Sequence, residues 1–275
     1  MDLANSIRQT SKVGSGALAV FIVLMSGAHA DAARLSPQTL VGSEALANLR
    51  GKTVLLAGAT GNNGRVVLRQ LAALGVQVRA MTRDAAGARK ELGAQFDWVE
   101  ADVTRPETLA AAMQGVNVVI DAVATMMPFG SNRSERVDYE GTINLARAAK
   151  AAGATRFVII TSSVSGKKDH FLNYIGGNVL IWKGRAEEEL MKSGLEYVVV
   201  GPTAMTDDPG GVQPIQIFSR DKYQSGMRIT REDVATVVIA AAALPDAANR
   251  TFSVANGVGP PMADWHRAFR NMPAK

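Results

Sequence analysis

Short apolar runs alternate with longer amphipathic stretches along the chain from Gly51 onward. The runs are nearly continuous rather than alternating, which is typical of parallel strands covered on both faces. They predict strands over Val54–Ala57, Val76–Thr82, Phe96–Ala101, Asn117–Val123, Arg156–Thr161, Glu196–Val200 and Thr251–Ala255. With helices between them and right-handed crossovers, the expected fold is α/β, a Rossmann-like doubly wound parallel sheet of about seven strands, in a single domain over residues 51–275.

Three less regular stretches each follow a predicted strand: residues 124–135, 164–177 and 203–228. Ligands of doubly wound sheets bind near the carboxyl ends of the strands, so these stretches are expected to border the site. The first of them contains an apolar lip, Met126 to Phe129. It either receives a flat hydrophobic substrate or packs as a lid on its own core.

Glycines at fixed spacing separate the first predicted strand from the helix that follows it. Gly58, Gly61 and Gly64 form a G-x-x-G-x-x-G turn. Such a turn brings the backbone close to a pyrophosphate without a Cβ in the way, and the helix N-terminus offers its N–H groups to the phosphates. The alternative is a purely structural βα turn, but the strand before it and the helix after it favour a dinucleotide.

Arg83 directly follows the second predicted strand. An acidic residue there would hold the ribose hydroxyls of NAD, whereas a guanidinium suits the 2′-phosphate of NADP. We therefore expect NADP, with NAD as the less favoured cofactor. A solvated arginine at a strand end is the alternative.

Composition excludes several other classes of site. The chain has no cysteine, so disulfides, thiolate metal sites and cysteine nucleophiles are excluded, and its three histidines are too scattered to predict a metal site. The formal net charge is +5, with no basic run beyond Lys167-Lys168. Nucleic acid is therefore not an expected partner.

Residues 1–30 have the layout of a secretory signal peptide. Arg8 and Lys12 precede an apolar stretch, Ala17 to Met25, and an A-x-A pattern ends at Ala30. We expect an exported, periplasmic protein, with residues 31–50 as a polar linker containing one short helix. The alternatives are a cytoplasmic domain, soluble or anchored to a membrane through residues 13–28, and a disordered extension.

A set of motifs accompanies these features: Gly58-Ala59-Thr60-Gly61-Asn62-Asn63-Gly64, Arg83-Asp84, Ala101-Asp102-Val103, Val137-Asp138-Tyr139-Glu140-Gly141-Thr142-Ile143-Asn144, Phe157 to Ser163, and Lys183-Gly184-Arg185-Ala186-Glu187. Through them, residues 52–256 resemble an atypical short-chain dehydrogenase/reductase, closest to the NAD(P)H-binding (NmrA-like, flavin-reductase-like) subgroup. The resemblance is specific for fold and cofactor, and weak for substrate.

The resemblance implies roles for individual positions. The pyrophosphate would lie against Gly58, Thr60, Gly61, Asn62, Asn63 and Gly64. Arg83 would read the 2′-phosphate, and the remaining cofactor contacts would come from Asp102 and Val103 at the adenine, Ala122 and Val123 after the fourth strand, Thr161 and Lys183 at the nicotinamide ribose, and Pro202 and Thr203 at the nicotinamide amide. Thr161, Ser162 and Ser163 would approach both the nicotinamide ribose and the substrate.

One departure from the family pattern concerns the catalytic acid. Typical members have a tyrosine four residues before the lysine, on the same helix face, and the lysine lowers the pKa of the phenol. Val179 occupies that position here. Tyr174, nine residues before Lys183, either reaches the substrate from its loop or is an aromatic wall of the pocket. The catalytic candidates are Ser162, Ser163, Tyr174 and Lys183.

These observations favour an NADP-dependent oxidoreductase that transfers hydride to or from a small, apolar or aromatic substrate. Without a tyrosine at position 179, the proton would come from water, Tyr174 or a ribose relay. The alternative is a non-catalytic NAD(P)H-binding sensor or assembly factor that recognises a protein partner.

Overall fold

The computed structural model describes residues 34–259 and 264–273 of the chain. The signal-peptide or anchor pattern of residues 1–30 lies outside these residues. Within them, no helix is both long enough and apolar enough to cross a membrane.

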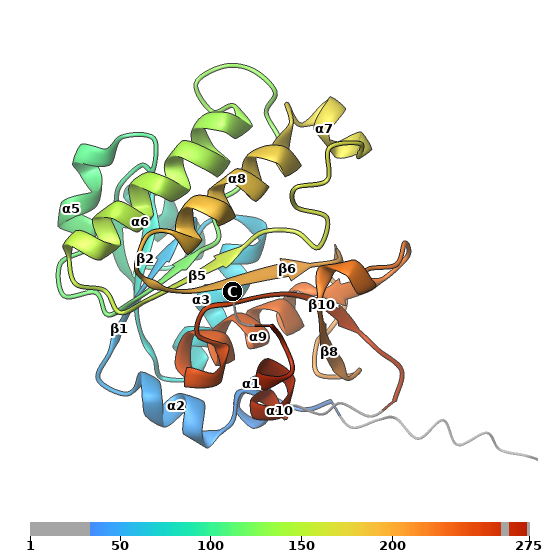
Figure 1. The fold of residues 1–275 in the computed structure, drawn as a ribbon. Coiled ribbons are helices and arrows are strands. Elements are labelled where there is room, and N and C mark those ends of the chain that lie inside the picture. The colour runs from blue at the N-terminus through green and yellow to red at the C-terminus, as the bar shows by residue number, and fades with distance from the viewer. Residues whose placement is uncertain (1–33, 260–263, 274–275) are drawn as a thin grey trace, which may run out of the picture. The chain divides into compact units, whose positions relative to one another are not determined.

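Eight strands form one sheet in the order β3-β2-β1-β4-β5-β6-β10-β8 (Figure 1). Seven strands run parallel, and β8 pairs antiparallel with β10 at one edge. The expected doubly wound, Rossmann-like fold is confirmed, with one strand more than expected, because β8 lies in the stretch 203–228. The strands are β1 (Thr53–Ala57), β2 (Gln77–Thr82), β3 (Asp97–Glu100), β4 (Val118–Asp121), β5 (Arg156–Ile160), β6 (Glu196–Pro202), β8 (Ile215–Phe218) and β10 (Arg250–Asn256).

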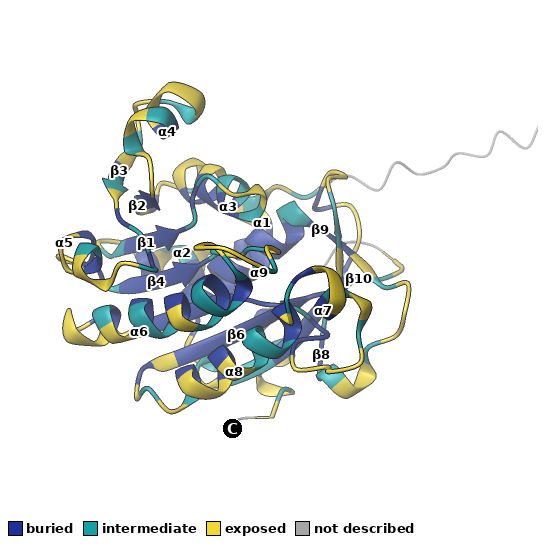
Figure 2. Cartoon of the chain, turned by 90° about the horizontal axis from the view of Figure 1, so that it is seen from above, coloured by how far each residue is buried: buried dark blue, intermediate teal, exposed yellow. Residues whose placement is uncertain are grey.

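Helices cover both faces of this sheet. Alternate residues of β1 face opposite layers: Val54 and Leu56 belong to the core beneath α3 (Asn62–Ala73) and α9 (Arg231–Ala243), whereas Leu55 and Ala57 belong to the core beneath α5 (Leu109–Ala112), α6 (Thr142–Ala151) and α8 (Val179–Met191). Figure 2 shows the buried strands between helices whose outer faces are exposed. Burial on both faces explains why the strands read as continuous apolar runs.

The remaining elements lie around this core. They are α4 (Ala85–Leu92), α7 (Phe171–Ile175), a two-stranded sheet of β7 (Ala204–Thr206) and β9 (Arg228–Thr230), the 3-10 turns η1 (Pro106–Thr108), η3 (Arg220–Lys222) and η4 (Pro245–Ala247), and the π-helix η2 (Glu135–Gly141) that leads into α6.

Residues 37–49 fold as two helices, α1 (Pro37–Val41) and α2 (Ser43–Leu49), and not as the expected polar linker with one helix. The reason lies in α9, whose residues from Val234 to Ala243 are all buried and, apart from Thr236, all apolar. Such a helix needs cover on the side away from the sheet. Both N-terminal helices pack there, and Val41 and Leu49 are buried in the same core.

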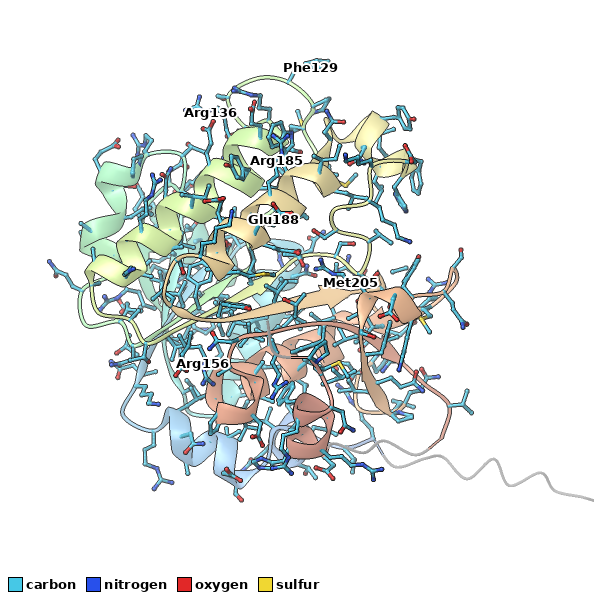
Figure 3. The ribbon with its side chains drawn as sticks, viewed as in Figure 1. Phe129, Arg136, Arg156, Arg185, Glu188 and Met205 are labelled. Carbon is cyan, nitrogen blue, oxygen red and sulfur yellow. The ribbon has the colours of Figure 1, made fainter. Side chains whose placement is uncertain are left out.

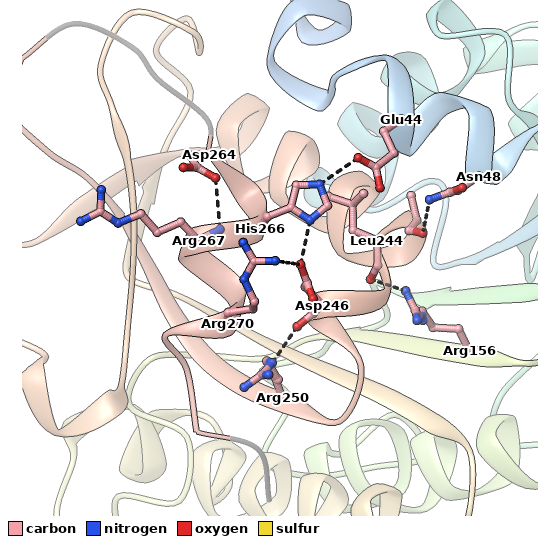
Figure 4. Close-up of polar contacts among 11 residues, drawn as sticks. Glu44, Asn48, Arg156, Leu244, Asp246, Arg250, Asp264, His266, Arg267 and Arg270 are labelled. Atoms are coloured by element: carbon pink, nitrogen blue, oxygen red, sulfur yellow. Dashed lines mark hydrogen bonds and ion pairs between the residues drawn. The ribbon is translucent and has the colours of Figure 1, made fainter.

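Polar contacts fasten this cover to the C-terminal helix α10 (Trp265–Arg270) (Figure 4). His266 lies between Asp246 and Glu44, with its ring nitrogens 2.7 Å and 2.9 Å from their carboxylate oxygens. The Trp265 indole N–H donates to the Leu40 carbonyl at 2.6 Å. The N- and C-terminal segments of the described chain are therefore joined to each other as well as to α9.

Candidate functional site

The glycine turn lies where the strand order reverses, between β1 and its neighbours β2 and β4. Gly58 has a φ of +75°, and a Cβ on it would lie 3.0 Å from the backbone of Ala122 and Val123. A Cβ on Gly64 would lie 2.0 Å from the Gly58 carbonyl oxygen. Both positions therefore require glycine, for two different reasons: conformation at Gly58 and close packing of α3 at Gly64.

Helix α3 begins at this turn without a side-chain cap. Gly61 is its N-cap residue, and the helix starts at Asn62. The first N–H groups of a helix have no acceptor within it, so this end can bind an anion. The Oδ1 atom of Asn63 is buried without a hydrogen-bond partner among the described residues. Arg65 fastens the turn by donating to the Thr60 carbonyl at 2.8 Å.

A cavity of about 440 Å³ extends from the turn along the ends of β2, β3 and β4. It includes eight of the predicted cofactor-binding residues: Gly58, Thr60, Gly61, Arg83, Asp102, Val103, Ala122 and Val123. Met127, from the apolar lip, also lines it. This cavity, called the cleft below, has the size and the position expected for a nucleotide in a doubly wound sheet.

Arg83 and Asp84 follow β2 directly, and both are exposed charged residues that line the cleft. The Arg83 Nη1 donates to the Asn132 side chain at 3.1 Å. The neighbouring Asp84 caps α4 instead, because its carboxylate accepts from the Gly87 N–H at 2.8 Å. The Asp84 carboxylate is thus engaged at the start of α4, whereas the Arg83 guanidinium is exposed in the cleft.

At the end of β3, Asp102 is held by its own turn. Its Oδ1 atom accepts from the N–H and the hydroxyl of Thr104, both at 2.8 Å. Val103 is buried, and a Cβ on Gly141 would come within 2.6 Å of its Cγ2. These two residues therefore form a fixed wall of the cleft.

The predicted residues at the ends of β5 and β6 lie against each other. None of them is among the residues that line the cleft. The Ser163 N–H donates to the Pro202 carbonyl at 2.9 Å, and the Ser162 hydroxyl accepts from the Val164 N–H at 3.3 Å. The Thr203 hydroxyl is buried without a partner in the described chain.

Thr161 contacts a buried ion pair that sequence reasoning missed. Arg220 makes two bonds to the Glu187 carboxylate, at 2.6 and 2.8 Å, and a third to the Thr161 hydroxyl at 3.3 Å. The Glu187 side chain is only 3% exposed. Glu187 begins a run of three glutamates that is most simply read as a solvated helix face, and only the tertiary contact with Arg220 reveals its burial.

Lys183 lies in α8 and donates to Asp138 at 2.7 Å. The Asp138 side chain is fully buried, and that of Lys183 is 12% exposed. Burial raises the pKa of Asp138, and the charge and hydrogen bond of Lys183 act against that rise. Asp138 sits in η2 directly after Val137, a residue of the cleft wall.

Asp121 is a second buried acid in this region, at the end of β4. It accepts from the Val123 N–H at 3.0 Å and from the Thr142 hydroxyl at 3.1 Å. Burial raises its pKa to about 6. Neither acid was identified as a site residue from the sequence. The available signal was an aspartate at the end of an otherwise apolar strand.

Position 179, where typical family members have the catalytic tyrosine, is buried, whereas Tyr174 is exposed. Val179 is buried against Val164 and Leu180. Tyr174 lies on α7 and is 83% exposed. The structure therefore does not bring Tyr174 together with Lys183 and the cleft, because α7 presents this side chain to solvent.

Comparison with known proteins gives relatives that agree with this site. Residues 58–245 match the NAD(P)H-binding family. Sanguinarine reductase from Eschscholzia californica is 29% identical over 260 residues, which cover 79% of this chain and 94% of that protein. The photosystem II assembly factor Ycf39 from Trieres chinensis is 30% identical over 212 residues, which cover 73% of this chain and 62% of that protein.

Among solved structures, a Bacillus halodurans protein classed with NAD-dependent epimerases and dehydratases has a TM-score of 0.66 and 25% identity. The match covers 76% of this chain and 96% of that protein. The likeness agrees with the Rossmann-like architecture described above.

Proposed function

The chain belongs to the NAD(P)H-binding family, and we propose that within it this protein is an NADP-dependent oxidoreductase of the atypical short-chain dehydrogenase/reductase type. It transfers hydride to or from a small, apolar or aromatic substrate. The observation that carries the proposal is the cleft that joins the glycine turn to Arg83. The similarity to a reductase, sanguinarine reductase, supports the same reaction class.

The chain's own groups fit the dinucleotide at both ends of the cleft. The uncapped start of α3, with Thr60, Asn62 and Asn63, would bind the pyrophosphate. Arg83 would bind the 2′-phosphate through charge-assisted hydrogen bonds. When bound, the nicotinamide supplies or accepts the hydride.

The substrate side is assigned to the ends of β5 and β6. Ser162 and Ser163 would orient the substrate oxygen, while Thr161, Pro202 and Thr203 border the nicotinamide, and the unpartnered Thr203 hydroxyl can accept or donate there. Lys183, held by Asp138, would bind the ribose hydroxyls and connect the substrate to a proton relay. Tyr174 could take part only if α7 moved.

Fluorescence titration with NADPH and NADH tests the cofactor assignment. Arg83→Ser is expected to weaken NADPH binding roughly tenfold or more, because the 2′-phosphate loses a charged hydrogen-bonding partner. The affinity for NADH, which lacks this phosphate, is expected to stay unchanged. Arg89→Ser removes the same charge from an exposed position on α4 and serves as the control. Absence of NADPH binding by the wild-type protein would overturn the proposal.

The second candidate is a non-catalytic NAD(P)H-binding sensor or assembly factor. Buried Val179 at the position of the usual tyrosine favours it, and so does the similarity to an assembly factor, Ycf39. NADPH oxidation in the presence of a quinone or a flavin would exclude this candidate. NADPH binding without turnover across a substrate screen, together with a co-purifying protein, would favour it over the oxidoreductase.

The cellular location is a separate proposal. The signal-peptide pattern of residues 1–30 supports export, with cleavage after Ala30. N-terminal sequencing of the protein purified from its own cells tests this, since a mature chain beginning at Asp31 is expected. An intact N-terminus in a membrane fraction would instead support an anchor through residues 13–28.

A further inference from the structure

Exposed apolar side chains are concentrated in two short segments. Eight large apolar side chains are exposed in the described part of the chain, and six of these lie within residues 126–129 and 171–175. They are Met126, Met127, Phe129, Phe171, Tyr174 and Ile175. Phe129 and Tyr174 are each 83% exposed. A cluster of this kind on a soluble domain marks an interaction site more often than scattered single residues do.

The two segments form one continuous surface, called the loop–α7 surface below. A Cβ on Gly177, just after α7, would lie 2.5 Å from the Cα of Pro128. The buried Ser134 hydroxyl donates to the Gly176 carbonyl at 2.7 Å. The loop after β4 is therefore packed against the end of α7, and the exposed side chains of both segments share one end of the molecule.

Helix α7 has an inverted polarity. Its polar residue, Asn173, is buried, while Phe171, Tyr174 and Ile175 are exposed. The Asn173 side chain donates to the carbonyls of Lys167 and Lys168, both at 2.8 Å, and accepts from the Leu180 N–H at 3.0 Å. These bonds hold the apolar side chains outward on a fixed platform, so their exposure is part of the fold.

Cationic side chains surround this surface. Lys167 and Lys168 are exposed just ahead of Asp169 and His170, which precede α7, and the Lys167 ammonium lies 5.0 Å from the Tyr223 ring centroid. Exposed Arg185 stacks over Trp182 at 4.8 Å from the ring centroid. Figure 3 shows Phe129 at the tip of the molecule, with Arg136 and Arg185 below it. Segments 126–136 and 167–178 together carry four lysines and arginines and two acids, a net charge of +2. Projecting apolar groups with a cationic border match an anionic membrane surface.

We propose that the loop–α7 surface docks on an anionic lipid bilayer, with its apolar side chains at the headgroup boundary and its lysines and arginines against the lipid phosphates. A second copy of this chain would bring two cationic borders together, which disfavours self-association. A protein partner is tested below as the other outcome. The inference does not depend on turnover at the cleft.

Docking in this orientation has a consequence for the cleft. Met127 belongs both to the loop–α7 surface and to the cleft lining. The bilayer would therefore lie beside the end of the cleft that Met127 lines.

Site-specific labelling tests the proposal on the full chain, because the sequence contains no cysteine. Phe129→Cys and Tyr174→Cys are each labelled with an environment-sensitive fluorophore. The fluorescence emission of both labels is expected to shift to shorter wavelength when the protein binds vesicles of phosphatidylcholine with phosphatidylglycerol. Val258→Cys is the matched control, since Val258 is fully exposed elsewhere. Insertion through residues 1–30 alone would not single out positions 129 and 174. An equal response at all three positions, or none, would overturn the proposal.

Charge variants test the role of the border. Lys167→Ala with Lys168→Ala is expected to weaken binding to the anionic vesicles by roughly tenfold or more, with circular dichroism and NADPH titration unchanged. Equal binding to vesicles of phosphatidylcholine alone would contradict the role assigned to the lysines. If the labels at positions 129 and 174 responded to a purified protein partner or to dimer formation, and not to vesicles, the occupant of this surface would be a protein and not the bilayer.

Discussion

Lys183 and Asp138 form an ion pair of 2.7 Å that joins α8 to the π-helix η2 behind the cleft wall. The Asp138 side chain is fully buried and therefore fixed by its surroundings. Its ion pair with Lys183 therefore also fixes the position of the Lys183 ammonium group. A π-helical turn inserts an extra residue into the helical path and re-aims its side chains. Here it brings Asp138 to Lys183, in a region where Val179 replaces the phenol that would otherwise accompany the lysine.

Asp138→Asn is expected to lower the free energy of unfolding by about 3 kcal/mol, because it leaves the largely buried Lys183 side chain without a counter-charge. Urea denaturation measures this. Glu189→Gln is the control, since it breaks the exposed Glu189–Lys192 pair and should cost less than about 1 kcal/mol. Equal losses in the two variants would show that the buried pair has no special role.

Asp121 should make stability fall as the pH rises. Its folded pKa, about 6, lies above the ordinary aspartate value of 3.8, so the folded state holds this proton more tightly than the unfolded chain does. Stability contributed by that proton is complete below about pH 4 and is lost as the pH rises to about 6, by about 3 kcal/mol in total.

Asp121→Asn tests this because its oxygen can still accept from Val123, and its amide can donate to Thr142. We expect the difference between wild type and variant to change with pH between about 4 and 6, measured by urea denaturation across that range. Parallel pH profiles for the two proteins would contradict a raised pKa at Asp121.

The fold and the nucleotide side of the site could be predicted because local rules determine them. The positive φ at Gly58 and the close packing at Gly64 are demands of one βα turn, and the residues for them are adjacent in the sequence. Likewise, Arg83 follows its strand directly, so its place on the sheet edge could be expected.

The rest depends on contacts between distant segments. The burial of Glu187 requires Arg220, 33 residues later, and α1 and α2 fold because α9 needs cover. Asp138 reaches Lys183 through a π-helical turn, which has no sequence signature comparable to a glycine turn. Exposure of Tyr174 follows from the burial of Asn173, a reversal of the polarity expected for a helix on a core.

Gly64→Ala should disrupt the glycine turn, whereas Gly61→Ala should not. A methyl group at position 64 would lie 2.0 Å from the Gly58 carbonyl oxygen, and at position 61 it would lie 3.3 Å from the same atom. We expect Gly64→Ala to lower the free energy of unfolding by about 2 kcal/mol through displaced backbone, with a change below about 1 kcal/mol for Gly61→Ala. Thermal and urea denaturation of the two variants provide the comparison, and equal stability would refute the close approach.

His266 should make the attachment of the N-terminal helices sensitive to pH. Its pKa is raised above 6.5, first by the hydrogen bond to Asp246 and then by that to Glu44. Arg270 contacts the Asp246 carboxylate at 3.2 Å, and Arg250 donates to the Asp246 carbonyl at 2.6 Å. A histidine with a raised folded pKa contributes stability that is complete below its unfolded pKa and is lost as the pH rises through the folded value.

The stability difference between wild type and His266→Gln is therefore expected to be largest below about pH 6 and to shrink as the pH rises above 6.5. His170→Gln serves as the control, because His170 caps α7 through a backbone contact to Leu172 and lies apart from this cluster. Limited proteolysis near α1 and α2 should follow the same trend, since protonated His266 holds Glu44 of α2 to Asp246. A difference that grew toward alkaline pH would show that the neutral imidazole makes the stabilising contacts.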